Sequence, residues 1–261
     1  MTSPKIFTPE YYARMRANEA GGWWNAGMRA AAALLLERAR LPATGTVLDV
    51  GCGSGQSIAW FLVAHPGWRA AGLDVALYGL RAARALGAGV SRASALALPH
   101  PAASADLVIT FDVIQHLPLT SGDSTALAEM RRVLRPGGWL LLRTNAQAFP
   151  HTRDDPAFAF RKYRPGDLEA KLTGAGFQVD RLSRINALPG LAEIPRELRA
   201  RRRHGDGYHG ILATPRPRRP LDRLLEGWLQ LEGRAVRRGW RLPMGRAILA
   251  LCQAGVSKEA S

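Results

Sequence analysis

The stretch that decides the fold is Val47-Leu48-Asp49-Val50-Gly51-Cys52-Gly53-Ser54-Gly55-Gln56. An apolar run precedes its three glycines, and residues 56–64 after them have the composition of a helix. Glycines let the backbone approach a ligand closely, and the free N–H groups at a helix N-terminus bind polar ligands. The stretch therefore predicts a ligand-binding loop between a strand and a helix.

Two acids beside this loop indicate the kind of ligand. The pattern that binds nicotinamide dinucleotides needs a glycine at position 56, where Gln56 stands. Asp49 instead lies two residues before the first glycine, and Asp74 ends the next apolar run, 19 residues after Gly55. A carboxylate at that position can accept hydrogen bonds from both hydroxyls of a ribose. The alternative is that Asp74 caps the following helix.

Around the loop, short apolar runs alternate with helical stretches. We predict strands over residues 46–50, 70–75, 90–94, 106–111, 139–144 and 177–183. We predict helices over 56–64, 77–86, 124–134 and 165–175, and a turn over 135–138. Strands that alternate with helices form βαβ units, so we expect a mostly parallel sheet covered on both faces.

Both ends of the chain depart from this alternation. Residues 1–44 are helical and aromatic and predict an N-terminal helical cap, whereas 45–187 form the core. Residues 188–243 predict a helical insertion with an Arg-rich piece over 194–203, and 244–261 return to a last strand and a tail. The insertion contains one amphipathic helix, whose apolar stripe is Leu221, Leu224, Leu225, Trp228 and Leu229.

Composition excludes several classes of protein. The chain has 261 residues, of which 47% are apolar and 22% charged, so it can bury a core. Its longest apolar run, 30–36, is far shorter than the roughly 20 residues that span a bilayer. The first residues lack the apolar region of a signal peptide, and Cys52 and Cys252 cannot make a disulfide framework. We expect a soluble cytoplasmic protein.

The net charge of +15 has two interpretations. Only 4 of the 36 basic residues are lysines, a bias typical of a GC-rich genome. The excess nevertheless gathers near the C-terminus, since residues 190–261 hold 15 basic and 7 acidic residues, a net of +8. Such a region could contact nucleic acid or an anionic membrane surface.

Five motifs in order resemble those of a class I S-adenosylmethionine-dependent methyltransferase of the domain 11/12 type. They are Asp49-x-Gly-x-Gly-x-Gly55, Gly72-Leu-Asp-Val75, Ala93-Ser-Ala-Leu-Ala-Leu-Pro99, residues 105–117 and Leu134-Arg-Pro-Gly-Gly-Trp-Leu140. One position departs, because Ser94 stands where the family usually has Asp in its adenine loop. The resemblance implies a Rossmann-like, doubly wound α/β fold. Its seven-stranded sheet has an antiparallel last strand, and a helical insertion lies between the last two strands.

The N-terminal region is similar to a bacterial subgroup of these enzymes. Glu19, Trp23, Trp24 and Arg29 match its Glu…Trp-Trp-Phe…Arg signature, with Asn25 in place of the Phe. The two tryptophans could close over the cofactor or pack the N-terminal helix on the sheet. The subgroup implies a cofactor and a reaction type, but no acceptor.

The resemblance also implies a set of residues that hold S-adenosylmethionine and its product S-adenosylhomocysteine. Asp49 is expected to meet the ammonium group of the cofactor and Asp74 its ribose. The expected cofactor-binding residues are Asp49, Gly51, Cys52, Gly53, Gly55, Gln56, Asp74, Val75, Ser94, Ala95 and Phe111.

Three further residues are catalytic candidates. Asp112 follows Phe111 at the end of the fourth strand, where the acceptor must approach. His116 is the candidate base because its pKa suits proton transfer near neutrality, although it could equally pack at the cleft edge. Tyr163 could orient the acceptor or be an ordinary surface aromatic. No metal is predicted, because Gln115 replaces the second carboxylate of the cation-binding Glu-x-x-Glu-His cluster found in some quinone methyltransferases.

These observations favour methyl transfer to a small-molecule acceptor, either apolar, lipid-like or glycan-linked, at oxygen or carbon rather than nitrogen. The alternatives are an RNA or other nucleic-acid methyltransferase and a non-catalytic cofactor-binding protein. The insertion is expected to cover the acceptor, with Arg199, Arg201, Arg202 and Arg203 meeting a phosphate or an anionic surface.

Overall fold

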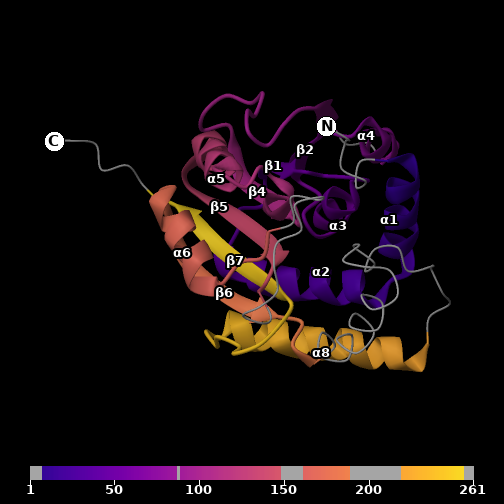
Figure 1. The fold of residues 1–261 in the computed structure, drawn as a ribbon. Helices are drawn as coiled ribbons and strands as arrows, with labels where there is room; N and C mark the ends of the chain where they lie inside the picture. Colours follow the sequence, from indigo (N-terminus) through magenta and orange to yellow (C-terminus); the bar gives the residue numbers. More distant parts are fainter. Residues whose placement is uncertain (1–7, 87–88, 148–160, 189–218, 256–261) are drawn as a thin grey trace.

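A computed structural model describes residues 8–86, 89–147, 161–188 and 219–255 (Figure 1). Its centre is a seven-stranded sheet in the order β3-β2-β1-β4-β5-β7-β6. The strands are β1 (Gly45–Val50), β2 (Trp68–Asp74), β3 (Gly89–Arg92), β4 (Ala105–Phe111), β5 (Leu134–Asn145), β6 (Phe177–Ile185) and β7 (Ala247–Ala254). The helices are α1 (Pro9–Gly21), α2 (Trp23–Leu36), α3 (Gln56–Ala64), α4 (Leu77–Arg84), α5 (Gly122–Val133), α6 (Pro165–Gly174) and α8 (Pro220–Arg237), with 3₁₀ turns η2 (Glu37–Ala39) and η3 (Ile114–His116).

The strand directions confirm the expected doubly wound sheet. Neighbours from β3 through β5 pair in parallel, and β7 pairs antiparallel with both β5 and β6. The order reverses between β1 and β4, so the crevice outside the carboxyl ends of these two strands is the place where such sheets bind ligands. The glycine loop that follows β1 lies at this edge.

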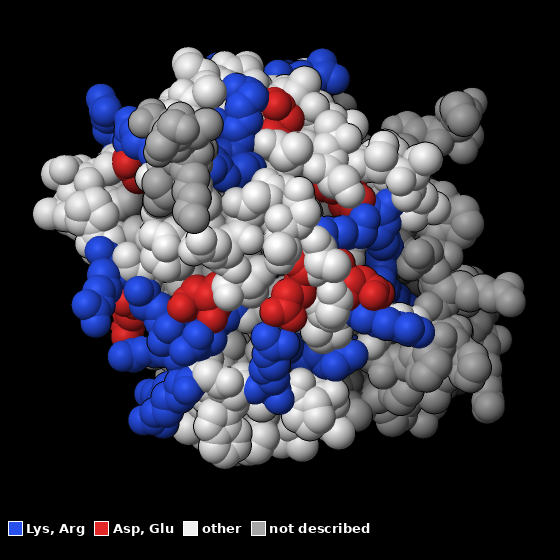
Figure 2. All heavy atoms as spheres, turned by 90° about the vertical axis from the view of Figure 1, so that its left-hand side faces the viewer, with Lys and Arg blue, Asp and Glu red and all other residues white. Residues whose placement is uncertain are grey.

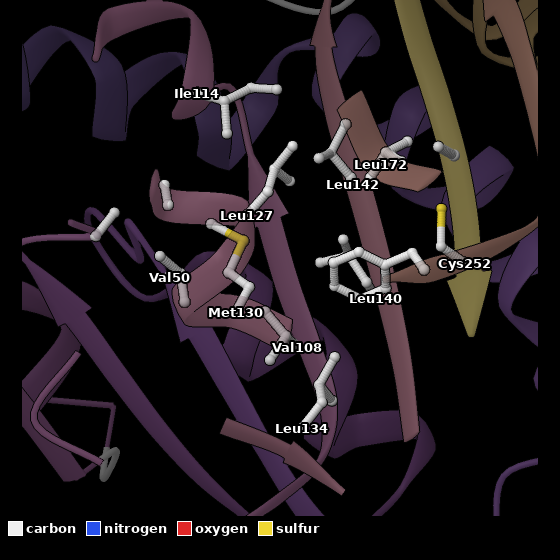
Figure 3. Close-up of a cluster of buried hydrophobic side chains, with 14 of the residues drawn as sticks. Val50, Val108, Ile114, Leu127, Met130, Leu134, Leu140, Leu142, Leu172 and Cys252 are labelled. Carbon is white, nitrogen blue, oxygen red and sulfur yellow. The ribbon is translucent and has the colours of Figure 1, made fainter. Parts of the chain in front are cut away.

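Helices cover both faces of the sheet, because its central strands are apolar on both sides. In β5 the consecutive residues Leu140, Leu141 and Leu142 are all buried. Leu140 and Leu142 face the side of α5 and α6, in a cluster that also contains Leu127, Met130 and Leu172 (Figure 3). Leu141 faces α2 and α8 on the opposite side.

The expected turn over residues 135–138 is instead a bulge within β5. Ala105 of β4 pairs with Leu134, whereas Leu107 pairs with Trp139, so the extra residues of β5 loop out between the two pairs. Gly137 adopts a φ of +79°, which only glycine tolerates at low cost. The glycines thus permit a bulge without ending the strand.

The amphipathic helix of the insertion packs differently from our expectation. Of its predicted apolar stripe only Leu229 is fully buried, while Leu221 and Leu224 are 56% and 70% exposed. The buried face of α8 lies further along the helix and contacts α2, where Gly233 meets Ala31 and Leu229 meets Gly27. Small residues on both helices permit this close approach, so the position of the glycines selects the buried face.

Other features of the flanks are as follows. The Arg-rich piece 194–203 lies outside the described residues. The last strand, predicted within residues 244–261, is confirmed as β7. No helix within the described ranges is long and apolar enough to cross a membrane.

Basic side chains gather on the lower half of the face shown in Figure 2, with acidic side chains between them.

Candidate cofactor and acceptor site

The glycine loop is held against β2 by its own backbone. The N–H groups of Gly51 and Cys52 both donate to the carbonyl of Leu73, at 2.8 and 2.9 Å. Gly51, Gly53 and Gly55 have φ angles of +78°, +50° and +81°, a region that side chains other than glycine rarely adopt. A Cβ on Gly51 would also clash with Val113 Cγ2. The sequence pattern therefore gives this loop both its conformation and its close packing.

Asp74 occupies the expected place at the carboxyl end of β2 and is 7% exposed. Its Oδ2 accepts from Gly53 N at 3.0 Å, and its Oδ1 accepts from Ala76 N at 2.8 Å. The N-cap residue of α4 is Ala76, so the alternative that Asp74 itself caps the helix is wrong. Asp74 instead joins the glycine loop to the turn after β2.

Asp49 is buried beneath the same loop, and its Oδ2 has no hydrogen-bond partner among the described residues. Burial raises the pKa of Asp49, and together with the nearby carboxylates of Asp74 and Glu19 it brings this pKa to about 8. Burial likewise raises the pKa of Asp74 and of Glu19. Three carboxyl groups thus converge on the loop, an arrangement that a bound cation stabilises.

Helix α1 lies over this part of the site. Tyr12 OH donates to Asp74 Oδ1 at 3.1 Å, and Ser54 Oγ donates to Glu19 Oε2. Met15 Cε lies 2.9 Å from the position that a Cβ on Gly53 would take. The N-terminal cap therefore contacts Asp74 and the glycine loop through three successive turns of one helix.

The residues expected around adenine form the far side of the crevice. Val75 is 41% exposed directly after β2, and Ala95 is buried. Ser94 Oγ accepts from Leu96 N at 3.2 Å, which leaves its hydroxyl hydrogen available as a donor. Cys52 is buried, and burial raises the pKa of its thiol, so it acts as a packing residue of the loop. Gln56 is the first residue of α3.

On the other side of the crevice, the end of β4 meets the end of β5. Phe111 pairs with Arg143 across the two strands. Arg143 Nε and Nη2 donate to Asp112 Oδ2 at 3.0 and 2.5 Å. The guanidinium carbon lies 4.6 Å from the ring centroid of Trp24 and 4.8 Å from that of Phe111. Trp24 thus packs on this arginine and on the α2 side of the core.

The remaining catalytic candidates lie around η3. His116 is half-buried there, with its Nε2 3.5 Å from Gln115 Nε2. The amide oxygen of Gln115 accepts from Thr144 Oγ1 at 2.8 Å and from Asn145 N at 3.1 Å, which binds the turn to β5.

Tyr163 is not a surface aromatic, because it is only 2% exposed. Its hydroxyl donates to Asp123 Oδ2 at 3.1 Å and lies 3.3 Å from the carbonyl oxygen of Ile114. Burial raises the pKa of this hydroxyl. Asp123 is also paired with Arg161 and Lys171. Tyr163 therefore lies in a buried polar network behind the turn, where it can position η3.

Four residues of the site have no assigned role in the sequence analysis: Tyr12, Glu19, Ser54 and Arg143. The contacts of the first three join α1 to Asp74 and to the glycine loop over more than thirty residues of sequence, which local patterns do not reveal. Arg143 did leave a signal, since it is a charged residue directly after the buried run Leu140–Leu142.

These residues fit S-adenosylmethionine. The ammonium group of the ligand can bind Asp49 Oδ2, which has no partner among the described residues. The ribose hydroxyls of the ligand can donate to the carboxylate of Asp74. The three glycines give the loop its positive φ angles, and Val113, Met15 and Ala83 pack where their Cβ atoms would lie.

Comparison with known proteins agrees with this fit. A family model described as a methyltransferase domain matches residues 48–142. Trans-aconitate 2-methyltransferase of an Azoarcus species is 37% identical over 142 residues, 54% of this chain and 53% of that protein. The protein of the same name from Methylobacterium nodulans is 31% identical over 179 residues, 61% of this chain and 68% of that protein. The chain spans about half the length of the Azoarcus relative.

A solved structure gives the same fold. A chain from the complex between the Haloferax volcanii Trm112 methyltransferase activator and a putative methyltransferase superposes with a TM-score of 0.62 at 19% identity, covering 99% of this chain and 100% of that chain. The family model, the two relatives and the sheet order agree with the five motifs around the glycine loop. The chain therefore belongs to the class I S-adenosylmethionine-dependent methyltransferases.

Proposed function

We propose that the protein transfers a methyl group from S-adenosylmethionine to a small-molecule acceptor, at oxygen or carbon rather than nitrogen. The observation that carries this proposal is the buried Asp49 Oδ2, which has no partner within the described residues and lies under a loop of three left-handed glycines. A buried carboxylate without a partner destabilises a protein unless a cation binds to it. When bound, S-adenosylmethionine supplies an electrophilic methyl group.

Each residue around the loop has a separate task in this proposal. Asp49 binds the ammonium group, and Asp74 binds the ribose hydroxyls after Tyr12 has released its Oδ1. Val75 flanks the adenine, and Ser94 donates to its edge in place of the usual carboxylate.

The acceptor enters where β4 and β5 end, beside Phe111 and Asp112. Ile185 and Asn145 both pair with Ala247, so the chain leaves β6 and returns to β7 at this same edge. We propose that residues 188–243 cover the acceptor; of this segment the structure describes residue 188 and residues 219–243. The chain just before it is fixed to α8, because the buried Glu232 accepts from Asn186 N at 2.6 Å and from Ala187 N at 3.0 Å.

Transfer of a methyl group depends mainly on the alignment of the reacting atoms. A base is needed only for an acceptor that is protonated at neutral pH, and His116 on η3 is the candidate for that role. The two relatives are named for trans-aconitate, so trans-aconitate is the first acceptor to test.

A second candidate function is methylation of a nucleic acid. It is favoured by an open hollow of about 370 Å³ that is lined by Arg38, Arg234, Arg237 and Arg238. Arg38 there is paired with Asp180, and Arg237 with Glu37, which neutralises part of the charge. The hollow is formed by the C-terminal parts of α8 and the turn after α2, so an RNA acceptor would need to span from there to the crevice.

Titration calorimetry tests the binding half of the proposal. We expect one S-adenosylmethionine per chain, and a 10- to 150-fold weaker affinity for Asp74→Ala, since hydrogen bonds to a charged group contribute roughly 1.5–3 kcal/mol. Asp167→Ala, which removes an exposed carboxylate from α6, is the control and should bind normally. Wild-type protein that binds NAD but not S-adenosylmethionine would contradict the proposal.

Methyl transfer is measured with tritiated S-adenosylmethionine and a cell extract that is separated into small molecules, lipids and RNA. We expect the label in the small-molecule or lipid fraction. Label confined to RNA would select the second candidate.

A further inference from the structure

Arg143 is a buried cation at the acceptor side of the site. Its side chain is 7% exposed, although it follows three consecutive buried leucines in the middle of the sheet. The rings of Trp24 and Phe111 lie within 5 Å of its guanidinium carbon, at 4.6 and 4.8 Å. The plane of the guanidinium is thus fixed by two aromatic neighbours from different elements, α2 and β4.

The hydrogen bonds of Arg143 leave part of the guanidinium unused. A guanidinium has five N–H donors. Arg143 directs Nε and Nη2 at a single oxygen of Asp112, and no other described side chain or carbonyl accepts from it. The remaining donors, including both on Nη1, belong to a side chain that is more than nine-tenths buried. Nη1 is not among the buried side-chain atoms that lack a partner, so its two donors keep access to solvent and are available to a ligand with complementary acceptors.

The position of Arg143 makes this ligand the acceptor. It pairs with Phe111 at the carboxyl ends of β4 and β5, on the opposite side of the crevice from Val75 and Ser94. A planar fork of N–H donors matches the two oxygens of a carboxylate better than a hydroxyl or an apolar group.

We propose that Arg143 binds a carboxylate of the acceptor and that the enzyme forms a methyl ester. This inference rests on the proposed function. The carboxylate oxygen forms a bond to the methyl carbon while the carbon–sulfur bond breaks with its electron pair on sulfur, and no proton moves. A carboxylic acid has an ordinary pKa near 4, so at neutral pH such an acceptor needs no base.

The chemistry of the product tests the proposal across a panel of candidate acids. The protein is incubated with tritiated S-adenosylmethionine and, in separate reactions, with trans-aconitate, citrate, succinate, benzoate, octanoate or a small-molecule extract. Alkali hydrolyses a methyl ester and releases the label as volatile methanol, whereas a methyl group on carbon, nitrogen or an ether oxygen stays bound. We expect alkali-labile label, and no label on benzamide or octanamide, the neutral analogues of two of these acids.

Variants of Arg143 show whether this residue recognises the acid. For Arg143→Gln we expect the KM for the acid to rise roughly 10- to 150-fold, while the Kd for S-adenosylmethionine stays within about twofold. Arg143→Lys keeps the charge but loses the planar fork of donors, so its KM for the acid should lie between those of the wild type and Arg143→Gln. Arg135→Gln is the matched control, because Arg135 pairs with Asp106 on the same two strands at their opposite end. If Arg143→Gln does not fold, the double variant Asp112→Asn/Arg143→Gln removes both charges together and is measured in its place.

The possible failures are distinguishable. Label that alkali does not release, or no label although S-adenosylmethionine binds, overturns the assignment of a carboxylate acceptor. Methyl ester formed with an unchanged KM by Arg143→Gln overturns the role of Arg143. A wild-type protein that neither binds S-adenosylmethionine nor labels any fraction overturns the proposed function itself.

Discussion

The pH dependence of cofactor binding is a direct consequence of the buried Asp49. Its pKa is raised to about 8, mainly by burial. At neutral pH the free protein therefore holds a proton on Asp49, and this proton must leave before the carboxylate can bind an ammonium group. We expect the affinity for S-adenosylhomocysteine, which has that ammonium group, to increase with pH up to about 8 and then to level off.

The size of the effect follows from the same pKa. Each pH unit below about 8 adds about 1.4 kcal/mol to the cost of ionising Asp49. The affinity should therefore change by about tenfold per pH unit, and binding at pH 7 should release close to one proton per chain. Asp49→Asn should weaken binding roughly 10- to 150-fold at pH 8, since it removes a charged partner. At pH 6 the wild type must also spend about 2.7 kcal/mol on ionisation, so the two proteins should bind about equally.

Calorimetry in buffers with different ionisation enthalpies measures both the affinity and the proton release. The control ligand is methylthioadenosine, which keeps the adenine and ribose but has no ammonium group, and whose binding should not depend on Asp49. A wild-type affinity for S-adenosylhomocysteine that stays constant from pH 6 to 8 would refute the role given to Asp49. So would an Asp49→Asn variant that retains the same pH dependence.

Three further variants test other parts of the site. Tyr12→Phe removes the hydroxyl that competes for Asp74 Oδ1, and we expect calorimetry to show up to about tenfold tighter cofactor binding; weaker binding would mean that Tyr12 stays on Asp74 in the complex. His116→Ala should leave cofactor affinity unchanged and lower kcat by roughly 10²–10⁴-fold if His116 is the base, but should leave kcat nearly unchanged if the acceptor is an ionised carboxylate. Glu232→Ala leaves two backbone N–H groups without their partner and should lower the free energy of unfolding by about 2–4 kcal/mol in urea titrations; Glu226→Ala, on the same helix, is the control for the loss of a Glu side chain.

The parts of the site that could be predicted from the sequence are those that depend on neighbouring residues. The glycine loop needs its φ angles whatever surrounds it, and Asp49 and Asp74 stand at fixed distances from strand ends. Because parallel strands end at one edge of the sheet, these two strand assignments suffice to bring the acids together. The doubly wound seven-stranded sheet and its antiparallel last strand followed from the family resemblance and are confirmed.

The parts that could not be predicted depend on contacts between distant residues. The apolar stripe of α8 has the right spacing for a buried face, but Gly27 and Gly233 decide which face approaches α2. The residues around Tyr163 in the sequence have the composition of an exposed loop. Its hydroxyl nevertheless has a buried partner, Asp123, which lies forty residues earlier in the chain. The spacing of apolar residues contains no information about either partner.

The buried carboxyl group of Asp49, which lies near those of Asp74 and Glu19, lowers the stability of the free protein and is explained by cation binding. The folded protein keeps its proton on Asp49 between pH 3.8 and about 8, a range in which the unfolded chain has released it. Folding therefore takes up a proton there, and the stability of the free protein falls as pH rises through this window, by at most about 1.4 kcal/mol per pH unit for one group. A scaffold protein would gain nothing from this arrangement, since an asparagine at position 49 would avoid the loss. A protein that binds a cation through Asp49, by contrast, has its highest affinity for the cation at the pH where the free protein is least stable. The increase in Tm caused by S-adenosylhomocysteine should consequently be larger at pH 8 than at pH 6, and an equal or smaller increase at pH 8 would show that the carboxyl groups do not serve cofactor binding.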